Sequence, residues 1–233
     1  MTQGTTTDKN EWLRARQALL EKEKAFSRYS DEIADMRREL PKLRIDADYV
    51  FDSTTGPVLL SELFDNRSQL IIQHFMFGPD AGAGCPICSF WADGYDPLIV
   101  HLNQRDITMV AVSRGPIEKL EAYRQRMGWQ FKWVSSANNS FNFEFGVSAS
   151  PSDIENGKMN YNYAEIPLQQ KELPGASVFE RGDDGAIYHT YSTYGRGLES
   201  FNATYGLIDL TPHGRQEGDL PFPLAWVRRR EDY

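Results

Sequence analysis

Residues 69–103 read QLIIQHFMFGPDAGAGCPICSFWADGYDPLIVHLN and carry the strongest structural signals in the chain. The stretch from Gln69 to Phe77 is apolar enough to form a buried central strand, and a Gly-rich loop follows from Pro79 to Gly84. Residues 89–103 favour a helix. Open α/β sheets keep their sites at the carboxyl ends of their strands, so this order predicts a functional site where the loop meets the helix.

The two cysteines of the chain, Cys85 and Cys88, both lie at this junction. A helix that begins near Cys85 points free backbone N–H groups and its positive dipole end at that sulfur, which favours the thiolate. Cys88 follows one helical turn later, close enough to attack a mixed disulfide, and Pro86 suits the first helical turn. The spacing therefore predicts a catalytic dithiol in which Cys85 attacks and Cys88 resolves.

Other interpretations of the pair stay open. Two ordinary buried cysteines can fall close together by chance. The thiolates could also hold copper or zinc in a non-catalytic binding module, completed by His74, by His189 or by a second copy of the chain. Peroxide reduction is a further alternative, with Cys85 oxidised to a sulfenic acid that Cys88 condenses with. For the leading interpretation we expect no cofactor beyond the redox-active disulfide itself.

The composition indicates a globular protein with no polyanion partner. The chain has 233 residues, 40% of them hydrophobic, and a formal net charge of −8. Nucleic-acid surfaces normally need clustered Lys and Arg, so we expect no nucleic-acid partner. The cluster from Arg228 to Arg230 is followed by Glu231 and Asp232, which predicts a solvated terminus.

The N-terminal residues Met1 to Asn10 are polar and lack the apolar core of a signal peptide, and no apolar run approaches the length of a membrane span. We therefore expect a cytoplasmic protein that makes no membrane contact. In a reducing compartment a C-x-x-C pair is more often catalytic or metal-binding than structural. The expected partner is a protein or small-molecule disulfide or thiol.

Two regions are expected, an N-terminal helical extension over residues 1–43 and an α/β domain over residues 44–233. From Asp8 to Glu39 apolar residues recur near helical spacing, and Asp8 with Glu11 resembles a capping box. The apolar stripe of this helix would pack either on the main domain or on a second subunit, so a homodimer is one expectation.

Within the domain, a buried strand over 107–112 and a helix over 117–127 follow the cysteine helix, which makes a βαβα pattern with a parallel crossover. Residues from about 135 to 172 are rich in Asn, Ser, Tyr and Phe without clear periodicity, and they predict an inserted loop region with short elements. Two β-prone runs around Gly182–Gly185 predict a hairpin from residue 177 to residue 191.

Several side chains are candidates to support the thiols. Trp91, on the cysteine helix, could form an apolar platform or belong to the core, and His74 on the central strand could lie beneath the site or be an ordinary buried histidine. The run from His189 to Gly197 is unusually rich in hydroxyls and aromatic rings. There, His189 could exchange protons with Cys85 and Arg196 could lower the thiol pKa, whereas Tyr191 and Tyr194 could instead form a hydrogen-bonded network that anchors the C-terminal segment.

The order of elements resembles the peroxiredoxin-like branch of the thioredoxin-like superfamily, and more narrowly the bacterial family DUF899. The residues that carry the narrower match are Arg37-Arg38-Glu39-Leu40-Pro41, Met76-Phe77-Gly78, Cys85 through Asp93, Ser113-Arg114, His189 through Gly197 and Asp209-Leu210-Thr211-Pro212. The resemblance implies a thioredoxin-like fold, with a central mixed β-sheet flanked by helices, and a thiol–disulfide oxidoreductase or a peroxide reductase.

The chain departs from better-known relatives at two places. Peroxiredoxins share a Pro-x-x-x-Thr/Ser-x-x-Cys loop, whereas here Pro79 lies six residues before Cys85 and Gly82 occupies the hydroxyl position. Thioredoxins usually place a cis-proline just before the hairpin strand, opposite the cysteines. The nearest proline is Pro174, and the resemblance implies that Ser177 fills the position instead. The loop difference argues against peroxide reduction, and a serine in the proline position would alter substrate docking and could admit a metal.

Overall fold

The computed structural model describes residues 6–233, and these divide into two compact units after Pro41. The first unit contains α1 (Lys9–Glu39), whose N-terminus is capped as predicted: the Asp8 carboxylate accepts hydrogen bonds from the backbone N–H groups of Asn10 and Glu11 at 2.8 and 2.9 Å. The second unit begins at Lys42 and contains the cysteines. The domain limits drawn from the sequence, with an insertion at about 135–172, stay predictions.

The second unit has the following elements in chain order: β1 (Leu43–Ile45), β2 (Val50–Ser53), β3 (Gly56–Leu59), η1 (Leu60–Phe64), β4 (Gln69–His74), α2 (Pro86–Tyr95), η2 (Asp96–Leu98), α3 (Ile99–Asn103), β5 (Ile107–Ser113), α4 (Ile117–Met127), β6 (Lys132–Ser135), α5 (Phe141–Glu144), α6 (Pro151–Asn156), β7 (Lys158–Tyr161), β8 (Ala164–Pro167), β9 (Gly175–Arg181), β10 (Ile187–Tyr194), η3 (Gly195–Phe201), α7 (Thr204–Ile208) and η4 (Arg230–Asp232).

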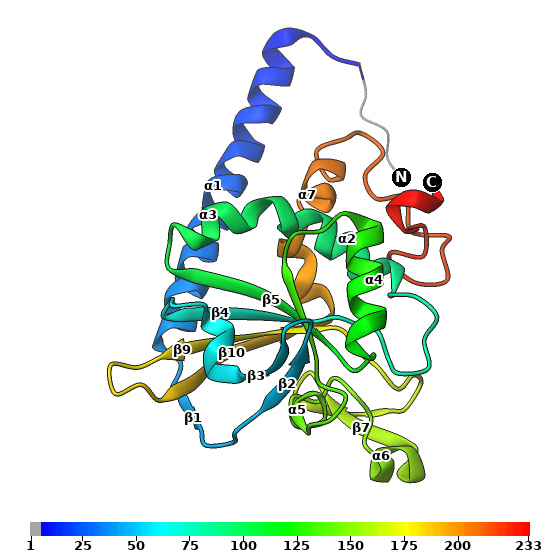
Figure 1. Cartoon of the computed structure of the whole chain (residues 1–233). Helices are drawn as coiled ribbons and strands as arrows, with labels where there is room; N and C mark the ends of the chain where they lie inside the picture. The colour runs from blue at the N-terminus through cyan, green and yellow to red at the C-terminus, as the bar shows by residue number, and fades with distance from the viewer. Residues whose placement is uncertain (1–5) are drawn as a thin grey trace. The chain divides into compact units, whose positions relative to one another are not determined.

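The main sheet has the strand order β1-β10-β9-β4-β5-β6-β2-β3 (Figure 1). Strand β4 lies at its centre, parallel to β5 on one side and antiparallel to β9 on the other, and β10 completes the hairpin with β9. A central strand that leads into the cysteine helix, a parallel neighbour and an antiparallel hairpin together make a thioredoxin-like core. The predicted fold class is therefore confirmed.

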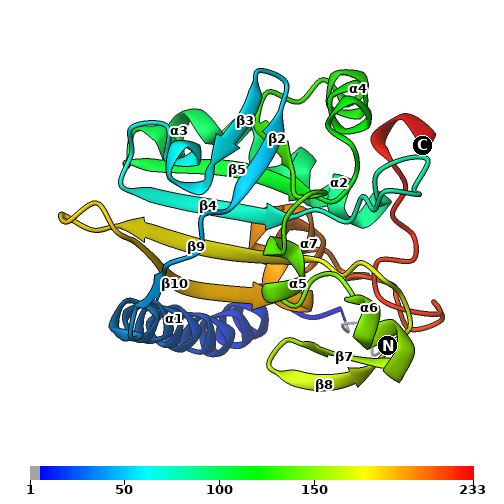
Figure 2. The same cartoon turned by 60° about the horizontal axis from the view of Figure 1, so that its bottom comes forward.

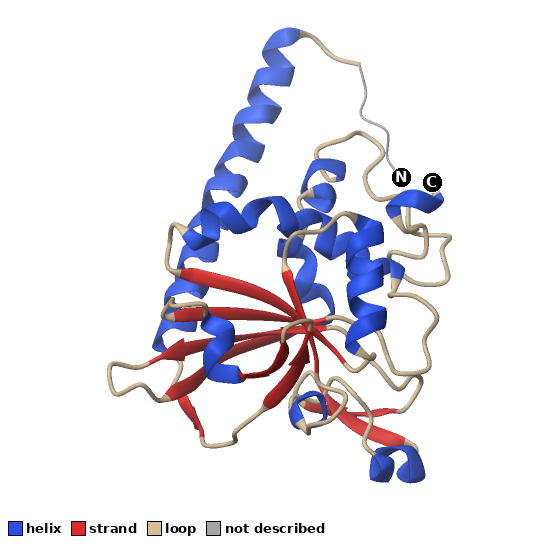
Figure 3. Cartoon of the chain, in the orientation of Figure 1, coloured by secondary structure: helices blue, strands red, loops and turns tan. Residues whose placement is uncertain are grey.

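Each face of the sheet has its own hydrophobic core because side chains alternate along the strands. On one face Phe75 packs with Cys88 and Ala92 of α2 and with Leu120 of α4, and Figure 3 shows α2, α3 and α4 together on that side of the strands. On the other face Leu70, Ile72 and Val110 pack with η1, α5 and β2. The alternation of side chains along β4 thus decides which of them approach the cysteines.

Helix α2 is fastened to β4 by a buried polar pair. Tyr95 donates a hydrogen bond from its hydroxyl to Gln73 Oε1 at 2.6 Å, and Gln73 Nε2 reaches the carbonyl of Cys88 at 3.4 Å. The single helix predicted over 89–103 is wrong, because α2 ends at Tyr95 and η2 and α3 follow. Pro97 cannot donate a backbone hydrogen bond, and the Asp96 carboxylate accepts bonds from the N–H groups of Gln130 and Phe131 instead.

Candidate redox site

Cys85 is the N-cap residue of α2, and Pro86 is the first residue of the helix. Cys85 and Cys88 lie 4.0 Å apart, and their thiols share a hydrogen bond. Cys88 is fully buried and its sulfur accepts a hydrogen bond from the backbone N–H of Met76 at 3.4 Å, whereas Cys85, Pro86 and Ile87 are partly exposed. A molecule arriving from solvent therefore meets Cys85 first.

The two thiols have opposite acidities. The hydrogen bond from Cys88 is the largest influence that lowers the pKa of Cys85, and the helix N–H groups of Cys88 and Ile87 and the charge of Arg229 lower it further. Burial opposes them, and the resulting pKa is about 7. Burial raises the pKa of Cys88 well above its ordinary value, and the neighbouring Cys85 raises it further. At pH 7 about half of Cys85 is therefore a thiolate, whereas Cys88 stays a thiol.

Arg229 reaches the site from the C-terminal segment. Its Nε donates to the carbonyl of Gly84 at 3.2 Å, and its guanidinium is hydrogen-bonded to Tyr123. The Tyr123 hydroxyl lies 2.9 Å from Ser89 Oγ, and the Ser89 hydroxyl donates to the carbonyl of Cys85 at 2.9 Å. The prediction of a solvated terminus is therefore wrong for Arg229. No local sequence signal could have found this residue, since only tertiary packing brings it to the cysteines.

We expect Arg229→Gln to make Cys85 less acidic, because the substitution removes a positive charge that stabilises the thiolate. Well below the midpoint, at pH 6, alkylation of Cys85 by iodoacetamide should slow by about threefold. Arg228→Gln is the matched control, because Arg228 is exposed and its guanidinium donates to the carbonyls of Ala225 and Val227 in its own segment. Equal pH profiles for the two variants would contradict the role given to Arg229.

Comparison with protein-family models decides the family. A model described as "Bacterial protein of unknown function (DUF899)" matches residues 1–233. The chain belongs to this family. No curated protein matches it.

Solved structures of peroxiredoxin type are similar to the chain at low sequence identity. Peroxidoxin BcpB from Mycobacterium tuberculosis is 17% identical with a TM-score of 0.47, and the match covers 72% of this chain and 96% of that one. Peroxiredoxin Q from Xanthomonas campestris is 12% identical with a TM-score of 0.48, and the match covers 71% of this chain and 95% of that one. The DUF899 description names no activity, so the chemistry must be argued from the site itself.

Trp91 belongs to a core rather than to an exposed platform. It is buried with Phe90, Tyr205 and Val227, and the ring of Phe90 meets that of Trp226 at 5.8 Å between centroids. These contacts hold the C-terminal segment against α2. Trp91 thus keeps Arg229 in place indirectly, and it offers no surface to a substrate.

His74, Ser177 and His189 lie on the face of the sheet opposite to α2. Gln73 points toward Cys88, and the next residue, His74, points to the other face of the sheet. The centroid of the His74 ring lies 5.6 Å from those of Phe141 and Phe145. Ser177 pairs with Ile72 and His189 with Phe179, both of which belong to the same opposite core. The structure brings these three side chains to one another and not to the thiols, so it does not place His189 for proton exchange with Cys85.

Arg196 and Tyr194 are bonded to groups other than the thiols. Arg196 is 81% exposed and pairs with Glu199 at 2.7 Å. Tyr194 donates its hydroxyl to the carbonyl of Phe145 at 3.1 Å, and the Tyr191 carbonyl accepts a hydrogen bond from His189. Among residues 6–233 no group of three or more His, Cys, Asp or Glu side chains could hold a metal ion. The side chains of His74 and His189, the ligands considered for a thiolate metal centre, lie on the face of the sheet opposite to the thiols.

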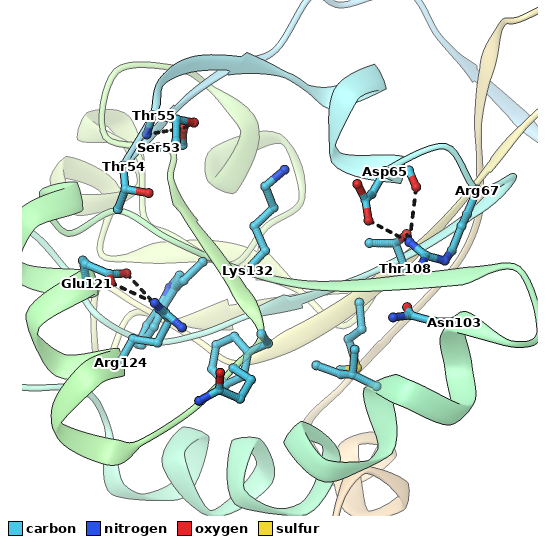
Figure 4. A pocket seen from close by; sticks show the side chains of 15 residues that line it. Ser53, Thr54, Thr55, Asp65, Arg67, Asn103, Thr108, Glu121, Arg124 and Lys132 are labelled. Carbon is cyan, nitrogen blue, oxygen red and sulfur yellow. Dashed lines mark hydrogen bonds and ion pairs between the residues drawn. The ribbon is translucent and has the colours of Figure 1, made fainter.

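A hollow of about 390 Å³ lies at the other end of the parallel strands (Figure 4). It is lined by Thr108 near the start of β5 and by Lys132 at the start of β6. Two of its cations are already paired, Arg67 with Asp65 and Arg124 with Glu121, each at 2.8 Å. The cysteines lie at the carboxyl ends of these strands, so this hollow is not part of the redox site. The described residues also include no helix long and apolar enough to cross a membrane.

Proposed function

We propose that this protein is a thiol–disulfide oxidoreductase in which Cys85 attacks a disulfide and Cys88 releases the product. The observation that carries the proposal is the asymmetry of the pair: a partly exposed Cys85 with a pKa of about 7 lies 4.0 Å from a buried, protonated Cys88. Dithiol exchange needs one thiolate that is ready at neutral pH and a second thiol held in reserve.

In the first step the Cys85 thiolate attacks one sulfur of a substrate disulfide. A bond forms between Cys85 Sγ and that sulfur, the substrate S–S bond breaks, and the other substrate sulfur leaves as a thiolate that takes a proton from water. Since Cys85 lies at the start of α2, the helix N–H groups of Ile87 and Cys88 stabilise the attacking thiolate.

The second step becomes easier once the first has occurred. Formation of the mixed disulfide removes the negative charge of Cys85, which is one of the causes that keep Cys88 protonated. Cys88 then loses its proton more readily and attacks Cys85 Sγ, which expels the second substrate thiolate and leaves the Cys85–Cys88 disulfide. Two protein thiols are oxidised and one substrate disulfide is reduced to two thiols. A thiol reductant must reopen the protein disulfide for a further cycle.

The test is a trapping experiment with the aromatic disulfide 5,5′-dithiobis(2-nitrobenzoate), read by release of the yellow thiolate and by mass spectrometry. Wild-type protein should release both halves of the reagent and end as an internal disulfide. Cys88→Ser should release one half and keep the other on Cys85, because the resolving thiol is missing. Cys85→Ser should react at least about tenfold more slowly, since the buried Cys88 is protonated.

The two cysteine variants act as controls for each other. If Cys85→Ser and Cys88→Ser react at the same rate and retain the same adduct, the assigned roles of the cysteines are wrong. An intact wild-type adduct that never resolves would also reject the mechanism, because Cys88 would then be unable to reach Cys85.

Peroxide reduction is a second candidate that the same 4.0 Å separation favours. Attack of the Cys85 thiolate on a hydroperoxide would give a sulfenic acid and an alcohol or water, and Cys88 would condense with the sulfenic acid to a disulfide and release water. Position 82 contributes no hydroxyl to this loop, since it is a glycine. Stopped-flow tryptophan fluorescence separates the candidates: a reaction with peroxide no faster than that of a free thiol leaves disulfide exchange alone.

A further inference from the structure

A cavity of about 360 Å³ opens on the face of the sheet opposite to the cysteine helix, beside the end of β10. Figure 2 shows the elements that meet there: β10, α5 and the β7–β8 hairpin lie at the same end of the sheet. Half of the lining residues carry aromatic rings, namely Tyr49, Phe145, Tyr161, Tyr163, Tyr194 and His189. This size and lining are those of a small-molecule site rather than of a packing defect.

The tyrosine rings are held by hydrogen bonds that their hydroxyls make within the protein. Tyr161 donates to the carbonyl of Pro174 at 2.6 Å, Tyr163 to that of Ser192 at 3.0 Å, and Tyr194 to that of Phe145 at 3.1 Å. The ring of Tyr194 meets those of Tyr161 and Tyr163 edge to face, with centroids 5.2 and 5.7 Å apart. Since these hydroxyls already donate hydrogen bonds within the protein, the tyrosines present their ring surfaces to a ligand.

His189 is held in one tautomer. Its Nε2 lies 3.0 Å from the carbonyl oxygen of Tyr191 and 2.7 Å from Ser192 Oγ. A carbonyl only accepts hydrogen bonds, so Nε2 must carry the proton. Burial lowers the pKa of His189, which keeps the ring neutral at pH 7. Nδ1 is therefore an acceptor, and it has no hydrogen-bond partner among the described residues.

A series of hydrogen-bonded, buried polar side chains begins at Nε2 of His189. Ser192 Oγ lies 2.7 Å from Ser177 Oγ, which lies 2.8 Å from Nε2 of His74. His74, Ser177 and Ser192 are all buried, and burial lowers the pKa of His74 to about 3, so that ring is neutral as well. Apolar residues would fill the same space without the cost of burying these three polar side chains. These hydrogen-bonded side chains instead orient the His189 ring and leave its Nδ1 atom without a hydrogen bond from them.

The charge of the lining narrows the class of ligand. Among the lining residues, all in the described part of the chain, Glu144 is the single formally charged side chain. Its carboxylate accepts hydrogen bonds from Tyr49 at 2.5 Å and from Ser140. An anionic ligand would meet this carboxylate without a cation to balance it.

We propose that this cavity binds a planar aromatic molecule that carries a hydroxyl or N–H donor and no negative charge, with the rings of Tyr161, Tyr163 and Tyr194 against its faces and edges and Nδ1 of His189 accepting its hydrogen bond. Neither cysteine lines the cavity, although burial first and then the neighbouring Cys88 raise the pKa of the wall residue Tyr161. Neither proposal depends on the other.

Isothermal titration calorimetry with three probes of one shape tests the assignment. 2-Naphthol is neutral and carries a donor, 2-methoxynaphthalene lacks the donor, and 2-naphthoate carries a negative charge. We expect saturable binding of 2-naphthol and about tenfold weaker binding of 2-methoxynaphthalene, as loss of one hydrogen bond predicts. 2-Naphthoate should bind more weakly still. Equal affinities for 2-naphthol and 2-methoxynaphthalene, tighter binding of the anion, or no binding of 2-naphthol overturns the proposal.

Two variants place the binding in the cavity. His189→Phe keeps an aromatic ring but removes the acceptor, so it should weaken 2-naphthol by about tenfold and abolish the preference over 2-methoxynaphthalene. Leu43→Trp enlarges an exposed lining residue and should weaken all three probes with no loss of fold. His101→Phe, at an exposed histidine outside the cavity, is the control. Unchanged selectivity in His189→Phe, together with unchanged affinity in Leu43→Trp, rejects the site.

The measurements should be repeated in the Cys85→Ser background. Binding there should equal that of wild-type protein, because Cys85 is not among the residues that line the cavity. Loss of aromatic binding in that variant would contradict the separation of the two sites, whereas loss of disulfide exchange with intact binding would concern the dithiol alone.

Discussion

Cys88→Ala should move the pH midpoint for alkylation of Cys85 from about 7 toward the ordinary thiol value of 9.0. The hydrogen bond from the Cys88 thiol is the largest influence that lowers the pKa of Cys85, and alanine cannot donate one. At pH 7 wild-type protein holds about half of Cys85 as thiolate, and a midpoint at the ordinary value would leave about one per cent. The rate of alkylation by iodoacetamide at pH 7 should therefore fall by up to about fiftyfold.

Cys88→Ser is the matched control for this effect, because a serine hydroxyl can still donate to the Cys85 thiolate. We expect its midpoint to stay closer to 7 than that of the alanine variant. Both variants leave Cys85 as the single cysteine of the chain, so the alkylation profile reports one group. A midpoint near 7 in Cys88→Ala would show that the helix N–H groups and Arg229 suffice to hold the thiolate.

Gly94→Ala should destabilise the protein strongly, although alanine normally favours a helix by about 1 kcal/mol. A Cβ at Gly94 would lie 2.6 Å from Cα of Asn202 and would also overlap the carbonyl oxygen of Phe201. These are backbone atoms that cannot rotate away, and Asn202 is itself fastened to the Phe90 carbonyl by a hydrogen bond. Overpacking of this kind costs about 1–3 kcal/mol, measurable as a fall in the denaturant midpoint.

Gly206→Ala supplies the comparison, because Gly206 also lies in a helix but a Cβ there would meet nothing within 4 Å. This variant should be neutral or more stable than wild type by up to about 1 kcal/mol. If the two alanine variants shift the midpoint alike, the close approach of α2 to Phe201 and Asn202 does not contribute to stability. Gly94→Ala should also loosen the segment that carries Arg229, so its Cys85 midpoint should rise as well.

Local signals were sufficient for the core of the fold. The apolar run of β4, the Gly-rich loop and the helix start at Cys85 are neighbours in the chain, so hydrophobic pattern and spacing alone predict a strand, a dithiol and a helix in that order. The break at Pro97 was the exception. A proline in the second position of a new turn is compatible with a continuing helix. Only the hydrogen bonds from the N–H groups of Gln130 and Phe131 to the Asp96 carboxylate show that α2 stops there.

The placement of the supporting side chains depended on long-range structure. His74 and Gln73 are adjacent in sequence, yet the alternation of side chains along β4 directs Gln73 to α2 and His74 to the opposite core. The register of β9 and β10 then places Ser177 beside His74 and puts His189 on the same face of the sheet. The sequence by itself determined an α/β core with a Cys85–Cys88 dithiol at a helix start, because strand hydrophobicity, helix dipole and cysteine spacing act over a few residues, and the thioredoxin-like fold was implied by the resemblance of its motifs. Only the tertiary structure decided that Arg229 stabilises the thiolate and that His189 lines a separate aromatic cavity, because those contacts depend on sheet register and on the packing of segments far apart in the chain.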